Sequence, residues 1–390
     1  MNQKIRVLFL PRWYPHQYDP MPGLFIQRQA ESITPFCDVA VIYVHPDPEC
    51  PNRYEVVFSE ENQVRVIRVY FKPVVCAIGF VGKALNLLKF YHAHQKAFKS
   101  IRQFSPQIIH SHLLTRMAFI GWRLSKKNNI PHVISEHWSR YFSENGTYQM
   151  GLHHVLTRYL IKKSDALIVV SEPLKTAMQA LHLDHPNLQI IHNVVDTKMV
   201  LHNPPMNPAS YITLIHVSCF EDKSKNISGL LRVLHALSEK RQNFSCELIG
   251  TGPDFDDLQA YAKDLGLLGQ FVTFTGMKTG QELLDQFEHA DFMVLSSHYE
   301  TFGSVIVEAL AMGIPVVTTQ VGIAPEVINE TNGIMVPPGD ELLLEDAVNT
   351  MINNCRNYNS KTIRNSVVGK FDPEFIGEKI VAIYKSLLSI

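Results

Sequence analysis

The sequence predicts an α/β protein made of two doubly wound, parallel-sheet domains, and three observations support this. The chain has 390 residues, of which 46% are hydrophobic, enough to fill two cores. Short runs rich in β-branched residues alternate with longer amphipathic runs along the whole chain. A segment with three prolines, residues 202–208, interrupts this alternation near the middle and is typical of a linker between domains.

The first half contains seven predicted strands and five predicted helices. Because the strands are continuously apolar rather than alternating, we expect a parallel sheet covered by helices on both faces. The strands are predicted at Ile5–Leu10, Val39–Tyr43, Val64–Tyr70, Gln107–His110, His132–Ser135, Ala166–Val170 and Gln189–His192. The helices are predicted at Gly23–Thr34, Val81–Phe104, Leu114–Lys127, Leu152–Lys163 and Pro173–Leu181.

The same alternation restarts after the linker. Strands are predicted at Tyr211–Val217, Cys246–Ile249, Phe271–Thr275, Phe292–Leu295, Pro315–Thr318 and Gly333–Val336. Helices are predicted at Ile227–Lys240, Phe255–Leu265, Gln281–His289, Ser304–Met312 and Leu342–Asn354, and a last helix begins at Asp372–Pro373. Since one sheet of all these strands is implausibly wide, we expect two sheets. The expected units are residues 1–204, 205–372 and a C-terminal helix over 373–390.

The charge distribution is uneven although the net charge is −1. Residues 1–205 carry 23 Lys and Arg against 14 Asp and Glu, whereas residues 206–390 carry 13 against 23. Residues 62–135 hold twelve basic side chains and no acidic one. This basic sector indicates an anionic partner, and a membrane surface or an anionic acceptor fits better than nucleic acid, for which no recognition pattern is present. Alternatively, the two halves attract each other across a cleft.

The expected location is the cytoplasm. The six cysteines have no metal-type spacing, and the N-terminal apolar stretch is too short for a secretion signal and is interrupted by Arg12. No apolar run is long enough to span a membrane. Residues 81–102 combine an apolar helical stripe with five basic residues, so peripheral contact with the inner face of the membrane is one interpretation and an ordinary core helix is the other.

Two glutamates eight residues apart stand out in the second half. Glu300 lies in the loop after the strand Phe292–Leu295, and Glu308 lies in the helix that follows Gly303. Ligands of doubly wound sheets bind at the carboxyl ends of strands. There the N–H groups of Gly303, Ser304 and Val305 suit a phosphate, and the carboxylates suit hydroxyl groups on either side of it. Glu308 is flanked by apolar residues, although a solvated helix-surface glutamate is the alternative.

These residues resemble a known family. The pattern E-x7-E followed by A-x-A-x-G-x-P-V-V (300–317) is similar to that of the retaining glycosyltransferases of family four, which have the GT-B fold. The similarity extends over nearly the whole chain, through the segments 13–33, 108–114, 169–175, 190–197, 247–259 and 274–276. It implies a first domain that binds the acceptor, a second that binds a UDP- or GDP-sugar, a cleft between them, and a C-terminal helix that returns to the first domain.

The resemblance also implies roles for individual residues. Glu308 would bind the ribose, Glu300 would bind hydroxyls of the donor sugar, and His112 would point toward the reacting carbon. Lys225 would neutralise the diphosphate. Gly23 would let the backbone approach the diphosphate. Backbone groups of Phe302, Gly303 and Ser304 would hold the sugar and phosphate. Gly276 and Met277 would line the pocket for the base.

One position departs from the family pattern. The arginine expected six residues before Lys225 is replaced by Cys219, which we expect to be packed. Charge on the diphosphate would then be balanced by Lys225, the helix N-terminus and, as weaker candidates, Lys223 or Arg28. No metal and no cofactor are expected, because no acidic metal-binding pair accompanies these motifs and His110 with His112 lacks a third ligand.

The predicted activity is sugar transfer to a glycan, polysaccharide or lipid-linked acceptor, with retention at the anomeric carbon. The main alternative is a nucleotide-sugar epimerase of the same fold. A nicotinamide dehydrogenase is disfavoured because residues 11–23 lack the G-x-G-x-x-G pattern. Aromatic and polar residues at first-domain strand ends are unranked candidates for acceptor contact: Trp13, Tyr14, His16, Trp138, Arg140 and Tyr141.

Overall fold

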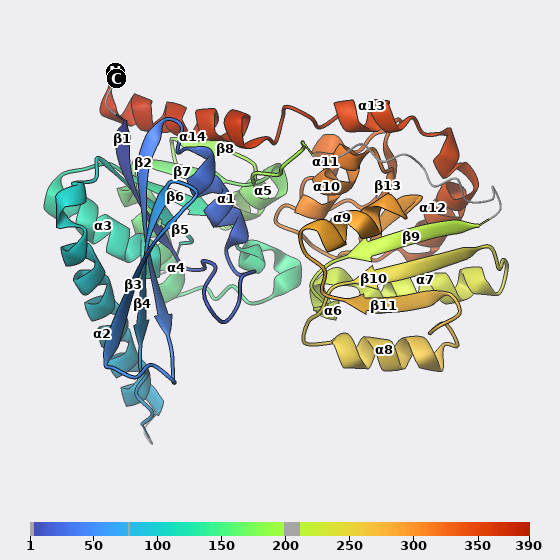
Figure 1. The fold of residues 1–390 in the computed structure, drawn as a ribbon, viewed down its shortest axis with the longest axis horizontal. Helices are drawn as coiled ribbons and strands as arrows, with labels where there is room; N and C mark the ends of the chain where they lie inside the picture. Colours follow the sequence, from blue (N-terminus) through green and yellow to red (C-terminus); the bar gives the residue numbers. More distant parts are fainter. Residues whose placement is uncertain (1–3, 77–78, 115, 199–210) are drawn as a thin grey trace.

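The first half of the chain forms an eight-stranded sheet in the computed structural model, which describes residues 4–76, 79–114, 116–198 and 211–390 (Figure 1). Its strands are β1 (Ile5–Pro11), β2 (Cys37–Pro46), β3 (Tyr54–Glu61), β4 (Val64–Phe71), β5 (Ile108–His112), β6 (His132–Glu136), β7 (Ala166–Val169) and β8 (Leu188–Ile190). Their order is β3-β4-β2-β1-β5-β6-β7-β8. All neighbours are parallel except β3 and β4, so the chain returns through helices between most strands.

Strand β3 is the one element of this sheet that the sequence pattern did not predict. It is an edge strand whose residues are largely exposed or half-buried, so it lacks the continuous apolar run of the others. It pairs with β4 through a tight turn at Asn62 and Gln63, whose φ angles are 47° and 68°. Two consecutive positive φ angles are typical of a two-residue hairpin turn.

Helices cover both faces of the first sheet. They are α1 (Leu24–Ser32), α2 (Gly79–Ser100), α3 (Arg116–Asn128), α4 (Leu152–Lys163) and α5 (Glu172–Ala180), with single turns η1 (Arg102–Phe104), η2 (Ser139–Tyr141) and η3 (Ser143–Asn145). Helices α2, α3 and α4 pack on one face, while α1 packs on the other. This burial on both sides explains why Ile108 and Ile109, which point to opposite faces, are both fully buried.

The second half forms a six-stranded sheet that is parallel throughout. The strands are β9 (Ile212–Val217), β10 (Phe244–Ile249), β11 (Val272–Gly276), β12 (Phe292–Leu295), β13 (Val316–Thr319) and β14 (Gly333–Val336), in the order β11-β10-β9-β12-β13-β14. Its helices are α6 (Asp222–Lys225), α7 (Ile227–Ser238), α8 (Phe255–Asp264), α9 (Gln281–Glu288), α10 (Ser304–Met312), α11 (Ala324–Val327), α12 (Glu341–Asn354) and α13 (Ser360–Asn365), with the turn η4 (Cys355–Asn357).

The last helix, α14 (Pro373–Leu388), returns to the first domain (Figure 1). Its buried side chains Ile376, Ile380 and Tyr384 join the core formed by α1 and the first sheet. At its start, the Asp372 carboxylate accepts hydrogen bonds from the backbone N–H and the hydroxyl of Thr197, at 3.2 and 2.5 Å. The two sheets and the returning helix confirm the predicted fold class.

The predicted linker, residues 202–208, lies outside the described residues. Within the described part of the chain, no helix combines the length and apolarity needed to cross a membrane.

Candidate functional site

The loop after β12 and the start of α10 lie at the carboxyl end of the second sheet. Gly303 caps α10 with a φ angle of 81°, a conformation that favours glycine, and Gly313 closes the helix with a φ angle of 83°. Ser304 is the first residue of the helix. The first N–H groups of α10 therefore have no partner within the helix, and they are oriented for an anion.

Glu300 and Lys225 form an ion pair beside this helix end. The Lys225 ammonium lies 2.5 Å from Glu300 Oε1, and the Ser297 hydroxyl donates to the same oxygen at 3.0 Å. Only 14% of the Lys225 side chain and 11% of the Glu300 side chain are exposed. Burial is the largest single influence and would lower the pKa of Lys225, but the neighbouring acidic groups, Glu300 above all, together outweigh it and the net pKa is raised. Lys225 is therefore a fixed positive charge at neutral pH.

Glu308 faces the other domain. Its carboxylate lies 3.5 Å from the guanidinium of Arg28 on α1, so this ion pair joins the two domains. Burial raises the pKa of Glu308, and the Arg28 charge only partly opposes that rise. The alternative of a solvated helix-surface glutamate is therefore wrong. Arg28, a weak candidate for a diphosphate contact, is held by Glu308 instead.

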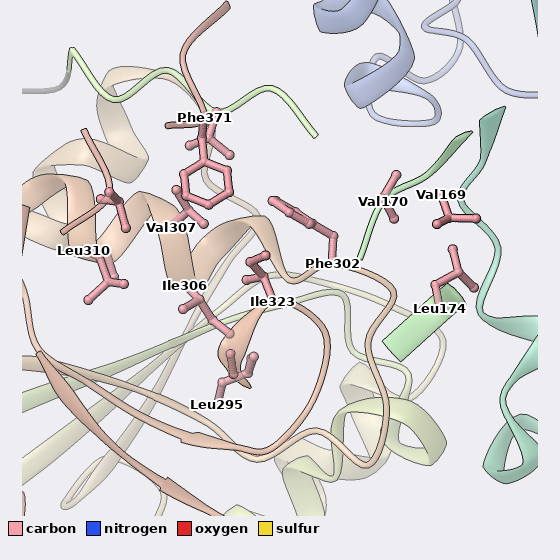
Figure 2. Packing of buried hydrophobic residues seen from close by; sticks show 14 of the residues in the cluster. Val169, Val170, Leu174, Leu295, Phe302, Ile306, Val307, Leu310, Ile323 and Phe371 are labelled. Atoms are coloured by element: carbon pink, nitrogen blue, oxygen red, sulfur yellow. The ribbon is translucent and has the colours of Figure 1, made fainter. Parts of the chain in front are cut away.

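Phe302 anchors the loop that carries Glu300, and its side chain does not face the space between the domains. Its ring is 1% exposed and lies in a core that joins both domains, with Val170 of the first domain and Phe371 nearby (Figure 2). Its carbonyl accepts the N–H of Ile323 at 2.7 Å, so this oxygen is occupied within the protein. The N–H groups of Gly303 and Ser304 remain as the loop's candidates for ligand contact.

His112 ends strand β5 of the first domain and is fully buried. Its ring stacks 4.3 Å from that of His110, and its Nδ1 lies 3.3 Å from His137 Nε2. Its own Nε2 is buried without a hydrogen-bond partner in the described part of the chain. Burial, with the neighbouring His110 and His137, holds the pKa of His112 well below its usual range. The imidazole is therefore neutral and has one nitrogen free for a ligand.

His110 holds this histidine stack in place. Its Nδ1 lies 2.6 Å from the hydroxyl of Tyr384 on α14, and its Nε2 lies 2.7 Å from the hydroxyl of Ser135. Both ring nitrogens are thus engaged within the protein. Across the described ranges, no set of three or more His, Cys, Asp or Glu side chains is arranged to hold a metal ion.

The predicted glycines Gly23 and Gly276 adopt the left-handed conformation that favours glycine. Gly23 has a φ angle of 75°, and a Cβ there would lie 2.2 Å from the carbonyl oxygen of Trp13. Glycine therefore allows the loop after β1 to pack closely against the start of α1. Gly276 ends β11 with a φ angle of 73° and open space around it. Met277, next to it, is 43% exposed, which suits a lining residue at that strand end.

Three expectations need correction. Cys219 is exposed rather than packed, because it lies in the loop after β9 at the mouth of the site. Tyr14 and Tyr141 are buried in the first domain, and the Tyr141 hydroxyl donates to Glu136 at 3.0 Å, so neither is accessible to an acceptor. Lys223 donates to the carbonyl of Asn145 at 2.7 Å, a contact between the domains.

Further contacts across the cleft could not be recognised in the sequence. The Ser171 hydroxyl donates to the carbonyl of Thr301, the residue before Phe302, at 2.6 Å. His192 lies 3.0 Å from the Glu326 carboxylate, which also accepts the N–H of Glu172 at 3.1 Å. These partners are more than one hundred residues apart, so no spacing pattern connects them.

Comparison with known proteins identifies both halves. The family model "Glycosyltransferase Family 4" matches residues 37–199, and "Glycosyl transferases group 1" matches residues 202–366. The glycogen synthase of Mycobacterium tuberculosis (strain H37Rv) is 26% identical over 297 residues, 73% of this chain and 69% of that protein. The N-acetyl-alpha-D-glucosaminyl L-malate synthase of Bacillus anthracis is 27% identical over 244 residues, 60% of this chain and 62% of that protein.

Solved structures agree on the architecture. The sucrose-phosphate synthase from Thermosynechococcus elongatus has a TM-score of 0.80 at 20% identity, covering 99% of this chain and 100% of that one. HepE from Anabaena, solved with UDP and glucose, has a TM-score of 0.72 at 18% identity, covering 98% and 100%. At these identities the likeness supports the fold alone. With both family models matched, the chain belongs to the group 1 glycosyltransferases of the family-four type and has the GT-B fold.

Proposed function

We propose that this glycosyltransferase uses a UDP- or GDP-sugar and transfers the sugar, with retention, to a glycan, polysaccharide or lipid-linked acceptor. The observation that carries the proposal is the buried Lys225–Glu300 pair beside the free N-terminus of α10. A fixed positive charge and unpaired N–H groups at one place suit a diphosphate leaving group. The UDP complexes of HepE make UDP-sugars the natural first donors to test.

The second domain would hold the donor by its two ends. Glu308 would accept hydrogen bonds from the ribose, and Arg28 would then leave Glu308 for another partner. Glu300, oriented by Lys225 and Ser297, would accept hydrogen bonds from hydroxyls of the sugar. The diphosphate between them would contact the first N–H groups of α10 and the Lys225 ammonium. As the bond from the anomeric carbon to the diphosphate breaks, these groups would stabilise the charge that develops on the leaving oxygen.

The first domain would supply His112 from the opposite side. Its neutral ring and unpartnered Nε2 suit a hydrogen bond to the donor sugar rather than a charge on it. No enzyme nucleophile is needed if the departing diphosphate takes the proton of the acceptor hydroxyl on the same face. A glycosidase-type pair of carboxylates is disfavoured, because Glu300 and Glu308 are each engaged by a cation.

A thermal-shift panel with UDP, GDP, ADP and CMP and their common sugars tests the donor site. A ligand that binds only the folded state, at 100 times its dissociation constant, adds about 2.7 kcal/mol of stability. We expect a shift with one nucleotide in the wild type that is lost in Glu308→Ala. No shift with any nucleotide, in a protein shown to be folded, would contradict the proposal. A nucleotide-sugar epimerase would also bind but would convert the sugar without an acceptor.

We also propose that the first domain contacts an anionic membrane surface. Helices α2 and α4 pack on the same face of the sheet, and each exposes apolar side chains: Phe80 is 77% exposed and Leu152 is 86% exposed. Exposed cations accompany them, including Lys83 on α2 and Lys162 on α4. Apolar side chains among cations suit insertion into an anionic interface. The apolar segment 74–82 lies partly outside the described residues.

Vesicle flotation tests this surface. We expect binding to anionic vesicles at low salt, weaker binding at high salt, and little binding to zwitterionic vesicles. Leu152→Ser should weaken binding. Leu342→Ser, which changes a side chain of the second domain that is 80% exposed, is the matched control. Equal loss in both variants, or no flotation of the wild type, would count against the proposal.

A further inference from the structure

Three arginines lie at the carboxyl end of the first sheet. Arg12 follows β1, Arg116 begins α3, and Arg140 lies in the turn η2 after β6. Within the described residues, none of the three lies within 4 Å of a carboxylate in an ion pair. Like charges repel at close range, so a cluster of unpaired cations needs a reason.

Trp138 is the centre of this cluster. The Arg140 guanidinium lies 4.7 Å from the centre of the Trp138 ring, and the Arg12 guanidinium lies 5.0 Å from it. Trp13 meets the same ring edge-on at 5.4 Å. The two guanidinium groups are therefore held by cation–π contacts, and two indoles lie beside them.

The cluster contains two donors that no group of the described residues satisfies. The Nε atoms of Arg12 and Arg140 are buried and have no hydrogen-bond partner in the described part of the chain. Burial lowers the pKa of Arg12, and the charges of Arg116 and Arg140 lower it further. Glu136, the nearby carboxylate, already accepts the N–H groups of Leu114, His137 and Trp138 and the Tyr141 hydroxyl. A buried donor without an acceptor is costly and rare, so these groups point to a ligand.

Strand register places this cluster around His112. Pro11, directly before Arg12, is the register partner of His112 on β5, and His112 is in turn the partner of Ser135 on β6. Arg116 follows His112 by four residues along the chain. The register therefore places Arg12 and His112 at the same end of adjacent strands, the end that would face the transferred sugar in the proposed function.

We propose that Arg12, Arg140 and Arg116 bind an anionic group of the acceptor, a carboxylate or a phosphate, next to its reacting hydroxyl. The guanidinium fork pairs with either group through two N–H donors, and Trp13 and Trp138 offer faces to the adjoining sugar ring. The inference rests on the proposed function, which makes the first domain the acceptor side, and it specifies an anionic acceptor.

Intrinsic fluorescence measures this binding directly, because the chain has three tryptophans and two of them, Trp13 and Trp138, lie in the cluster. In a Trp122→Phe background, the probes are methyl β-D-glucuronide for a carboxylate, glycerol 1-phosphate for a phosphate, and methyl β-D-glucoside as a neutral match. We expect a saturable change with at least one anionic probe and none with the glucoside. Whichever anion binds more tightly identifies the chemistry.

Variants then locate the response. Arg12→Gln and Arg140→Gln should each weaken binding of the anionic probe at least about tenfold, since each removes a charge-assisted pair. Arg102→Gln removes an exposed arginine of η1 and should leave the response intact. Lys225→Ala should also leave it intact, which separates this subsite from the donor site.

Several results would overturn the inference. These are an equal response to the neutral probe, no saturable response to either anion in folded protein, or a response that survives Arg12→Gln and Arg140→Gln but disappears in Lys225→Ala. The nucleotide panel does not involve this cluster. If a nucleotide shifts the melting temperature but no anionic probe changes the fluorescence, the anionic acceptor is rejected and the proposed function stands. If an anionic probe binds but no nucleotide does, the proposed donor site is rejected.

Discussion

At the scale of single residues, Lys225 is the charge on which the proposed reaction depends. Its ammonium is nearly buried and lies 2.5 Å from Glu300 Oε1. Lys225→Gln should lower the transfer rate by roughly 10²–10³-fold, because one preorganised group that stabilises the leaving diphosphate is lost. The measurement is kcat with a saturating donor, beside the nucleotide affinity, which should change less.

Lys223→Gln is the matched control for that prediction. Lys223 is two residues away but donates to the Asn145 carbonyl of the first domain, so its loss should reduce the rate only a few-fold. Similar losses in both variants would mean that Lys225 acts by holding the loop rather than through its charge.

Residue roles could be anticipated only where the chemistry is local. Glu300 and Glu308 are eight residues apart in a strand–loop–helix unit, so their spacing alone places both at a ligand edge. The Arg28–Glu308 pair joins residues 280 positions apart, and the exposure of Cys219 depends on the path of its loop. Neither leaves a periodic signal in the sequence.

At the scale of elements, α14 links the domains through a close approach to α1. Gly377 packs against Ser32 so tightly that a Cβ there would lie 2.2 Å from the Ser32 carbonyl oxygen. Gly377→Ala should therefore separate the two helices and destabilise the protein by about 1–3 kcal/mol, although alanine is the better helix former. Urea unfolding measures this change.

Glu378→Ala, on the exposed side of the same helix, is the control and should change stability by less than about 0.5 kcal/mol. If Gly377→Ala matched it or were more stable, α14 would not be bound tightly to α1.

Elements were predictable in proportion to their burial and length. The thirteen predicted strands all appear, because most of them are apolar runs buried between helices. The half-exposed edge strand β3 and the short helices α6, α11 and α13 were missed, since β3 is not buried on two faces and helices of four to six residues are too short to show a helical period.

At the scale of the whole molecule, buried histidines should govern stability toward acid. Burial lowers the pKa of His132 and His137 to about 3 and those of His94 and His216 to about 4, and it holds His110 and His112 well below their usual range. Five of these six belong to the first domain. Burial raises the pKa of Glu136 and Glu308, which opposes the effect, but these are only two groups.

The direction of this pH dependence follows from the protons that the histidines bind on unfolding. A buried histidine stays neutral in the folded state but is protonated below about pH 6.5 once unfolded. The stability it contributes is therefore complete above that pH and is lost as the pH falls toward the folded value, by about 1.4 kcal/mol for each histidine at pH 5.5. The free energy of unfolding, measured in urea at pH 7.5 and 5.5, should fall steeply, with the first domain affected more.

His132→Gln isolates one histidine of this set. Its ring is buried on β6, with Nε2 2.8 Å from the Ser111 hydroxyl, so the substitution costs stability at both pH values. The difference between pH 7.5 and 5.5 should nevertheless shrink by about 1.4 kcal/mol, because one proton fewer binds on unfolding. His92→Gln changes an exposed histidine of α2 and should leave that difference as it is. If both variants kept the wild-type pH dependence, the acid sensitivity would arise from the carboxylates and not from the buried histidines.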